Sequence, residues 1–166
     1  MGNGNGRDES ERVLPAPELL WRFLETDGWH PQRLESPSLF RAGFIGENGQ
    51  YTCYAQALVD PELFAFYVIS PFKVPPDLRP AAAEFLTRVN YGMRVGNFEM
   101  DYSDGEVRYK SALLFDGVPL NETLIRNTIY PAVRTMDRYQ PGLMRLVYGG
   151  ATPEQACAEI EGGKRG

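Results

Sequence analysis

The sequence has few cysteines and no long apolar run, and each shortage excludes a class of protein. Cys53 and Cys157 are the two cysteines among 166 residues, too few for a disulfide framework or a zinc ligand set, so we expect buried, idle thiols. No apolar stretch approaches the roughly 18 residues of a membrane span, and the N-terminus lacks the basic and apolar regions of a signal peptide. These absences favour a cytoplasmic protein without membrane contact.

Basic residues and histidine are also scarce. The chain has 17 Lys and Arg against 22 Asp and Glu, a formal charge of −5, and its basic residues are scattered, which disfavours nucleic acid as a partner. The one histidine, His30, precedes Pro31 and has no nearby nucleophile that the sequence singles out. The stretch from Asp101 resembles a calcium loop, but Ala112 stands where the chelating Glu belongs. We therefore expect no enzyme, no cofactor and no metal site.

The length fits one domain with one hydrophobic core. The 43% apolar and 23% charged content is that of an ordinary globular protein. Residues 1–14 are rich in Gly, Asn and charge, which predicts a disordered lead, and residues 162–166 predict a flexible tail. The domain itself should span residues 15–161.

The first half of the domain predicts one helix and three strands. The helix begins near Pro17 and ends at Gly28, and it carries apolar residues at helical spacing. Asn48-Gly49 between two β-rich runs predicts a hairpin with positive φ at both turn residues. If Glu47 and Gln50 flank that turn, the opposed pairs on the core side are Phe44 with Cys53, Ala42 with Ala55 and Phe40 with Ala57.

The third strand and the second helix follow. The run Leu63–Ile69 is apolar at both alternating sets of positions, which indicates a strand buried on both faces. Asp77 is the expected N-cap of a helix whose apolar stripe runs from Leu78 to Val89.

A second hairpin is predicted at Asp104-Gly105. Pairing Ser103 with Glu106 gives a charged, solvated face and an aromatic, buried face. The expected pairs are Asp101 with Arg108, Glu99 with Lys110, Met100 with Tyr109 and Tyr102 with Val107.

The C-terminal third predicts helices only. Asn121 caps a helix that Pro131 should interrupt, because proline removes a hydrogen bond from a helix interior. Thr152 and Gln155 are spaced as a capping box that opens a last short helix. The order helix, three strands, helix, two strands, helices predicts an α+β fold: a mostly antiparallel five-stranded sheet with helices packed on one side.

One side of the first three strands has no obvious cover. It carries large apolar side chains opposite the side where Phe44, Phe64 and Phe66 pack on small residues. Three covers are possible: the chain's own later helices, the second subunit of a symmetric dimer, or a segment of a partner protein. The side chains concerned, the candidate partner-binding residues, are Tyr54, Leu58, Leu63, Tyr67 and Ile69, with Ile45 beside them.

Several segments resemble the YbjN-domain family. They are Glu84–Asn90, Gly96–Glu99, Asp104–Lys110 and Met136–Tyr139 with Pro141-Gly142, and the resemblance extends from about Pro17 to about Glu161. It implies the fold of type III secretion chaperones, which commonly dimerise and bind segments of other proteins; some family members are described as sensory-transduction regulators. The family has no accepted catalytic motif, so the resemblance implies no active-site residues.

Two functions fit these patterns best, and an enzyme built on Asp or Glu chemistry is a third, less favoured one. The leading one is a non-catalytic, chaperone-like or regulatory adaptor, a homodimer that holds a partner segment against the Tyr54 and Tyr67 side. The alternative is a small-molecule sensor whose ligand fills a pocket between sheet and helices.

Overall fold

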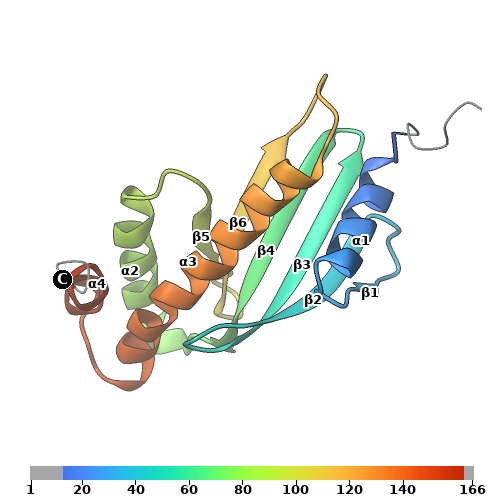
Figure 1. Cartoon of the computed structure of the whole chain (residues 1–166). Helices are drawn as coiled ribbons and strands as arrows, with labels where there is room; N and C mark the ends of the chain where they lie inside the picture. Colours follow the sequence, from blue (N-terminus) through green and yellow to red (C-terminus); the bar gives the residue numbers. More distant parts are fainter. Residues whose placement is uncertain (1–12, 163–166) are drawn as a thin grey trace, which may run out of the picture.

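The computed structural model describes residues 13–162, which form a six-stranded antiparallel sheet with helices on one face (Figure 1). The strand order is β1-β2-β3-β4-β6-β5. Apart from residues 13, 14 and 162, the lead and the tail expected from the sequence lie outside the described residues. The elements are α1 (Ala16–Thr26), β1 (Gln32–Arg33), β2 (Leu39–Ile45), β3 (Gln50–Val59), β4 (Glu62–Lys73), η2 (Pro76–Leu78), α2 (Arg79–Tyr91), β5 (Asn97–Met100), β6 (Glu106–Leu114), α3 (Glu122–Tyr148) and α4 (Pro153–Gly162).

The predicted α+β class is confirmed, and the sheet has one strand more than expected. The extra strand, β1, pairs two residues with β2, and a strand that short leaves no alternating pattern in the sequence. At the opposite edge β5 is closed by a side chain: Asn90 of α2 accepts a hydrogen bond from the Phe98 N–H at 2.7 Å and donates one to the Phe98 carbonyl at 2.9 Å. These two hydrogen bonds take the place of those that a neighbouring strand would make.

The hydrophobic core lies between the sheet and the helices. Alternate residues of the three central strands point to this side, and α1 and α3 lie over it (Figure 1). The helix α2 packs on β5 and α3, and α4 packs on the outer side of α2 and against α3. Phe64, Phe66 and Val68 of β4 are fully buried there. Cys53 belongs to this core, and Cys157 is buried on α4, as predicted.

The register of the first hairpin differs by two residues from the prediction. Ala42 lies opposite Cys53 and Phe40 opposite Ala55, so the core-facing side chains are the predicted ones but their partners are not. A shift of two preserves the face because side chains alternate with period two. The turn itself is Glu47-Asn48, and neither Asn48 nor Gly49 has a positive φ. The cause is a contact with α3, described below.

The second hairpin shows the same two-residue shift. Glu99 lies opposite Arg108 and Met100 opposite Val107, and Tyr102, expected to be buried, is 55% exposed. Asp101 leaves the strand because its Oδ1 accepts hydrogen bonds from the N–H and the hydroxyl of Ser103 at 2.8 and 2.6 Å. Such a carboxylate-centred turn ends a strand early.

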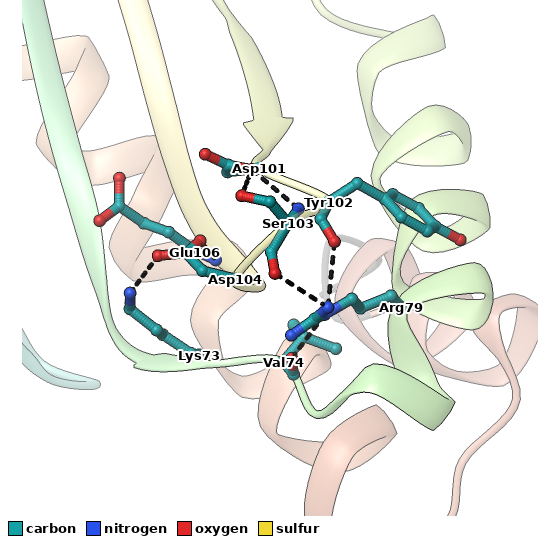
Figure 2. Close-up of polar contacts among 8 residues, drawn as sticks. All are labelled: Lys73, Val74, Arg79, Asp101, Tyr102, Ser103, Asp104 and Glu106. Atoms are coloured by element: carbon teal, nitrogen blue, oxygen red, sulfur yellow. Dashed lines mark hydrogen bonds and ion pairs between the residues drawn. The ribbon is translucent and has the colours of Figure 1, made fainter.

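Figure 2 shows how this hairpin loop is fastened to the start of α2. The Arg79 guanidinium donates hydrogen bonds to the carbonyls of Val74, Tyr102 and Ser103 at 3.0 to 3.3 Å. The Asp104 carboxylate, which forms an ion pair with Lys73, also accepts from the Glu106 N–H. Arg79 therefore ties two loops together.

Two predictions about helix ends and breaks are wrong, and one is confirmed. Asp77 is no N-cap: it lies in the 3-10 turn η2, and α2 begins at Arg79 without a side-chain cap. Asn121 does cap α3, since its Oδ1 accepts the Leu124 N–H at 3.0 Å. The interruption expected at Pro131 is absent, and α3 runs unbroken for 27 residues.

The proline positions explain why α3 continues. Pro131 is exposed, and Asn127, whose carbonyl loses its helical donor, is exposed too, so water can replace that bond. Pro141 likewise frees the carbonyl of Asp137. This carbonyl accepts a hydrogen bond from the Asn48 side chain at 3.0 Å instead. One freed carbonyl therefore has a side-chain donor, and the other belongs to an exposed residue.

The predicted capping box of α4 is confirmed. The Thr152 hydroxyl accepts the Gln155 N–H at 3.2 Å, and the Gln155 side chain accepts the Thr152 N–H at 3.0 Å. Reciprocal bonds of this kind satisfy two donors at a helix start.

Candidate protein-binding face

The five candidate residues share the face of the sheet that points away from the helices, which we call the open face. Each of the five side chains is half-buried, and none belongs to the core or packs against it. The helices within residues 13–162 lie on the other face (Figure 1). The chain's own later helices, one of the three possible covers, therefore do not cover it.

The strand register joins the candidates into one patch. Tyr54 lies directly opposite Tyr67, and Leu58 opposite Leu63. Leu114 of β6 extends the leucine row from the other side of Leu63 and is 70% exposed. Ile69 sits beyond the tyrosines. Cross-strand neighbours on one face have Cβ atoms about 5 Å apart, so the side chains of each row lie side by side over β3, β4 and β6. The row of Gln56, Ala65 and Ala112 lies between the tyrosines and the leucines.

Cations flank the tyrosine pair on both sides. The register gives a row across four strands: Lys110 of β6, Tyr67, Tyr54 and Arg41 of β2. Arg108, one row further along β6, places its guanidinium 4.8 Å from the centre of the Tyr67 ring. That distance is within the range of a cation–π contact.

Three carboxylates lie near the cations of β6: Glu99 pairs with them, and Asp101 and Glu106 line a small hollow together with Glu99 and Arg108. Glu99 of β5 lies 3.0 Å from the Lys110 ammonium and 3.5 Å from the Arg108 guanidinium. Arg41 is exposed and has no ion pair with any residue that the structure describes. The row itself therefore has a cation on each side of the two tyrosines, on a chain whose formal net charge is −5.

The sequence interpretation missed these cations as part of the site. It placed Lys110 and Arg108 on a solvated face of a separate hairpin, and it did not consider Arg41. Neighbourhood across the sheet depends on strand order, and β6 rather than β5 lies next to β4. Alternation along each strand gives the face, but strand order is a tertiary property.

A hollow of about 680 Å³ lies between the β2–β3 hairpin and α3 and was also missed. Arg134 and Arg138 of α3 line it, with Phe44 and Ile45 of the hairpin among the remaining lining residues. Arg134 and Arg138 have no ion pair with any described residue. No motif in the sequence marks this hollow, because its two sides are far apart along the chain.

Asp137 is the buried polar centre beneath that hollow. Its carboxylate accepts hydrogen bonds from the N–H groups of Glu47 and Asn48, both at 2.9 Å, and from the Tyr51 hydroxyl at 2.8 Å. Burial, followed by the bond to Asp137, raises the pKa of the Tyr51 hydroxyl well above its usual range, so it remains a donor. These bonds draw the hairpin tip onto α3 and fix its turn. The sequence shows Asp137 only as part of a family-like segment.

The other candidate chemical groups take ordinary places. Burial raises the pKa of the Cys53 thiol to about 12, which keeps it protonated. His30 is exposed, with a φ of 49°. Residues 13–162 bring no three His, Cys, Asp or Glu side chains together as a metal site. Over the same range, no helix combines the length and the apolar character that crossing a bilayer requires.

Comparison with known proteins gives a family and a fold. The model of the YbjN family, described as "Putative bacterial sensory transduction regulator", matches residues 16–145. A chain in the crystal structure of the ExsC-ExsE complex is similar, with a TM-score of 0.54 and 16% identity, over 75% of this chain and 90% of that one. No curated protein sequence matches. The structural likeness shows a shared fold, in agreement with the chaperone-like α+β arrangement that the family resemblance implies.

Proposed function

This chain belongs to the YbjN family, and on that premise we propose that it is a non-catalytic regulatory adaptor that holds a segment of a partner protein on its open face. One observation carries the proposal: rows of tyrosines and leucines on one sheet face that the described helices leave uncovered. The similar fold in a complex of two proteins, ExsC and ExsE, supports a chaperone-like role.

The composition of the open face suits protein binding. Tyrosine and arginine are enriched where proteins meet, because each combines a large contact area with a polar group. Tyr54, Tyr67 and Arg108 contribute these groups at the centre of the patch, and leucines border it. Burial of the remaining apolar area by a partner contributes about 25 cal/mol per Å² to the free energy of binding.

A homodimer is part of the proposal, and an exposed apolar surface of α3 is the proposed dimer interface. Met144 is 44% exposed and Tyr148 69% exposed, and together with Pro141 they line a shallow, mostly apolar hollow of about 380 Å³. Paired through this surface, two copies leave both open faces free for partner segments. Light scattering of the purified chain measures this directly: twice the monomer mass supports the dimer, and a monomer contradicts it.

The remaining parts of the proposal concern compartment and chemistry. We place the protein in the cytoplasm, with no nucleic acid, membrane or cofactor as its partner. The net charge of −5 supports the first of these exclusions. The thiol of Cys53, buried in the core and protonated, and the exposed His30 offer no reactive pair for catalysis.

Affinity capture from cell lysate tests the adaptor role. Wild type and the Tyr67→Asp variant are compared, with Tyr91→Asp as the matched control because Tyr91 of α2 is 96% exposed and lies off the open face. A partner segment on this face would bury the new carboxylate opposite Tyr54, which is costly, so Tyr67→Asp should lose a protein that wild type and Tyr91→Asp retain. Identical captured proteins from all three folded chains would refute the role.

A small-molecule sensor remains the second candidate, because the hollow beside Asp137 is lined by two arginines that have no ion pair with a described residue, with Glu47 also in its wall. An anionic metabolite is the ligand class that they favour. Thermal unfolding against a metabolite panel discriminates between the functions, since a ligand bound to the folded state raises the melting temperature. The sensor is favoured if a metabolite raises the melting temperature of wild type and of Tyr67→Asp but not that of Arg134→Ala or Arg138→Ala.

A further inference from the structure

The two outer cations of the open face define a width. Lys110 and Arg41 lie in one row, three strands apart, with Tyr67 and Tyr54 between them. Neighbouring strands are about 4.8 Å apart, so the two cationic residues are separated by about 14 Å. An α-helix with its side chains is about 10 Å across. A helix that lies on the tyrosines therefore fits between the two cations.

The apolar residues define a length. The patch runs along β3 from Thr52, which faces Ile69, to Leu58, which faces Leu63. At about 3.3 Å per residue, this part of the strand measures about 20 Å. A helix rises about 1.5 Å per residue, so about 13 residues cover the patch.

The charge of the face limits what can occupy it. Glu99 forms ion pairs with both Arg108 and Lys110, and Asp101 and Glu106 lie beside Arg108. Arg41 stands apart on the other flank. A second copy seated face to face on the tyrosine row would bring its own Lys110 and Arg41 against these cations, which is unfavourable. A basic segment meets the same repulsion. A segment with carboxylates on both sides of an apolar stripe is complementary to the row.

We propose that the open face receives an acidic amphipathic helix of a partner protein. Its apolar stripe covers Tyr54, Tyr67 and the leucine row, and its flanking carboxylates meet Lys110 and Arg41. An unpaired sheet face is commonly covered by such a helix in folded domains. The inference rests on the proposed adaptor function and adds to it the chemistry and the conformation of the bound segment.

Synthetic peptides test the inference without a known partner. The probe is a fluorescein-labelled peptide of about 14 residues with Leu at i, i+3, i+4 and i+7 and Glu beside the stripe on both sides. Three relatives carry Gln for every Glu, Lys for every Glu, or one central Pro in the acidic peptide. Fluorescence anisotropy at low salt measures the affinity of each for the full chain.

The acidic peptide should bind most tightly, and the Gln peptide should bind at least about fivefold more weakly, since each exposed ion pair contributes up to about 1 kcal/mol. The Lys peptide should not bind. The central proline should abolish binding, because it breaks the helix. Added salt should weaken the acidic peptide only.

Charge-reversed variants locate the contact. Arg41→Glu and Lys110→Glu should each weaken the acidic peptide about fivefold or more. Arg22→Glu is the matched control: Arg22 is exposed on α1, over the other face of the sheet, and its reversal changes the net charge by the same amount. It should bind the acidic peptide as wild type does.

The outcomes separate this inference from the adaptor function. Equal binding of the Glu, Gln and Lys peptides, lost in Tyr67→Asp, would overturn the acidic preference and leave the face as a binding surface. Undiminished binding of the proline peptide would overturn the helix. No binding of the acidic peptide at about 1 mM, or equal effects of Arg22→Glu and Lys110→Glu, would overturn the inference, while the lysate capture still decides the adaptor function independently.

Discussion

At the scale of single residues, Asp137 does the most to shape the β2–β3 hairpin. A buried carboxylate is costly unless donors satisfy it, and here two backbone N–H groups and the Tyr51 hydroxyl do so. The same residue's carbonyl receives the Asn48 side chain in place of the donor that Pro141 lacks. One residue of α3 thereby fixes the turn of the hairpin, the register of its strands and its close packing on α3.

Replacing Asp137 by Asn should lower the free energy of unfolding by about 2 kcal/mol, because the amide NH2 would face a backbone N–H that then has no acceptor. Urea unfolding measures the loss. Hydrogen exchange at the Glu47 and Asn48 amides should accelerate. Asp116→Asn, an exposed carboxyl after β6, is the control and should unfold as wild type does; equal stability of both variants would contradict the account.

Asp27 at the end of α1 predicts a pH dependence. Partial burial opposes its ionisation, but hydrogen bonds from Tyr130, Trp29 and Arg126 outweigh this and hold its pKa below the usual value. A folded-state pKa below the unfolded one gives stability that is present above a pH of about 4 and is lost as the pH falls through the folded-state pKa. Asp27→Asn should therefore unfold more easily than wild type at pH 7.

Chemical denaturation at several pH values checks this. The difference between wild type and Asp27→Asn, about 1 kcal/mol at pH 7, should shrink below pH about 4 and vanish at the most acidic values. Tyr130→Phe, which removes the 2.7 Å hydrogen bond to Asp27, should make the same difference smaller. A gap that stays constant from neutral to acidic pH would show that the ionised carboxylate is unimportant.

At the scale of secondary-structure elements, the close contact of a hairpin with a helix depends on a glycine. A Cβ atom on Gly46 would lie 2.2 Å from Oδ1 of Asp137, whereas one on Gly43, three residues earlier in the same strand region, would meet nothing within 4 Å. The same change, glycine to alanine, can therefore be made at a position that contacts α3 and at one that does not.

Gly46→Ala should lose about 2 kcal/mol of stability, because the hairpin tip must move away from α3. Gly43→Ala should be neutral or up to about 1 kcal/mol more stable, since alanine restricts the unfolded chain. Thermal or urea unfolding of the two variants compares them. Two equal values would mean that the hairpin tip does not pack on α3 as described.

The elements also show what the sequence could predict. Alternation gave the core face of each predicted strand correctly, but the expectation that the run Leu63–Ile69 is buried on both faces was wrong, because no described helix covers the second face of β4. Caps such as Asn121 and the Thr152–Gln155 box have purely local causes. Both hairpin registers were wrong by two residues because side chains set the turns: Asp137, distant in sequence, in the first and Asp101 in the second. The helix break expected at Pro131 does not occur, because the exposed Asn127 carbonyl can bond to water.

At the scale of the whole molecule, the sheet is covered on one face and open on the other (Figure 1). Although the chain is acidic, Lys110 and Arg41 lie beside the tyrosines of the open face. The apolar half of this site, from Tyr54 to Ile69, could be predicted, since it needs only the parity of two neighbouring strands. Its cationic half could not, because Lys110 and Arg41 become neighbours of the tyrosines only through the order β2-β3-β4-β6.

Site-specific photo-crosslinking in cells tests most directly whether the open face is the binding surface. A photoreactive phenylalanine replaces Tyr54 or Tyr67 in turn, and Tyr91 in the control, because aromatic residues already occupy these positions. The account predicts that one partner protein is crosslinked from positions 54 and 67 and not from position 91. Crosslinking of that partner from position 91 alone, or equally from all three positions, would contradict it.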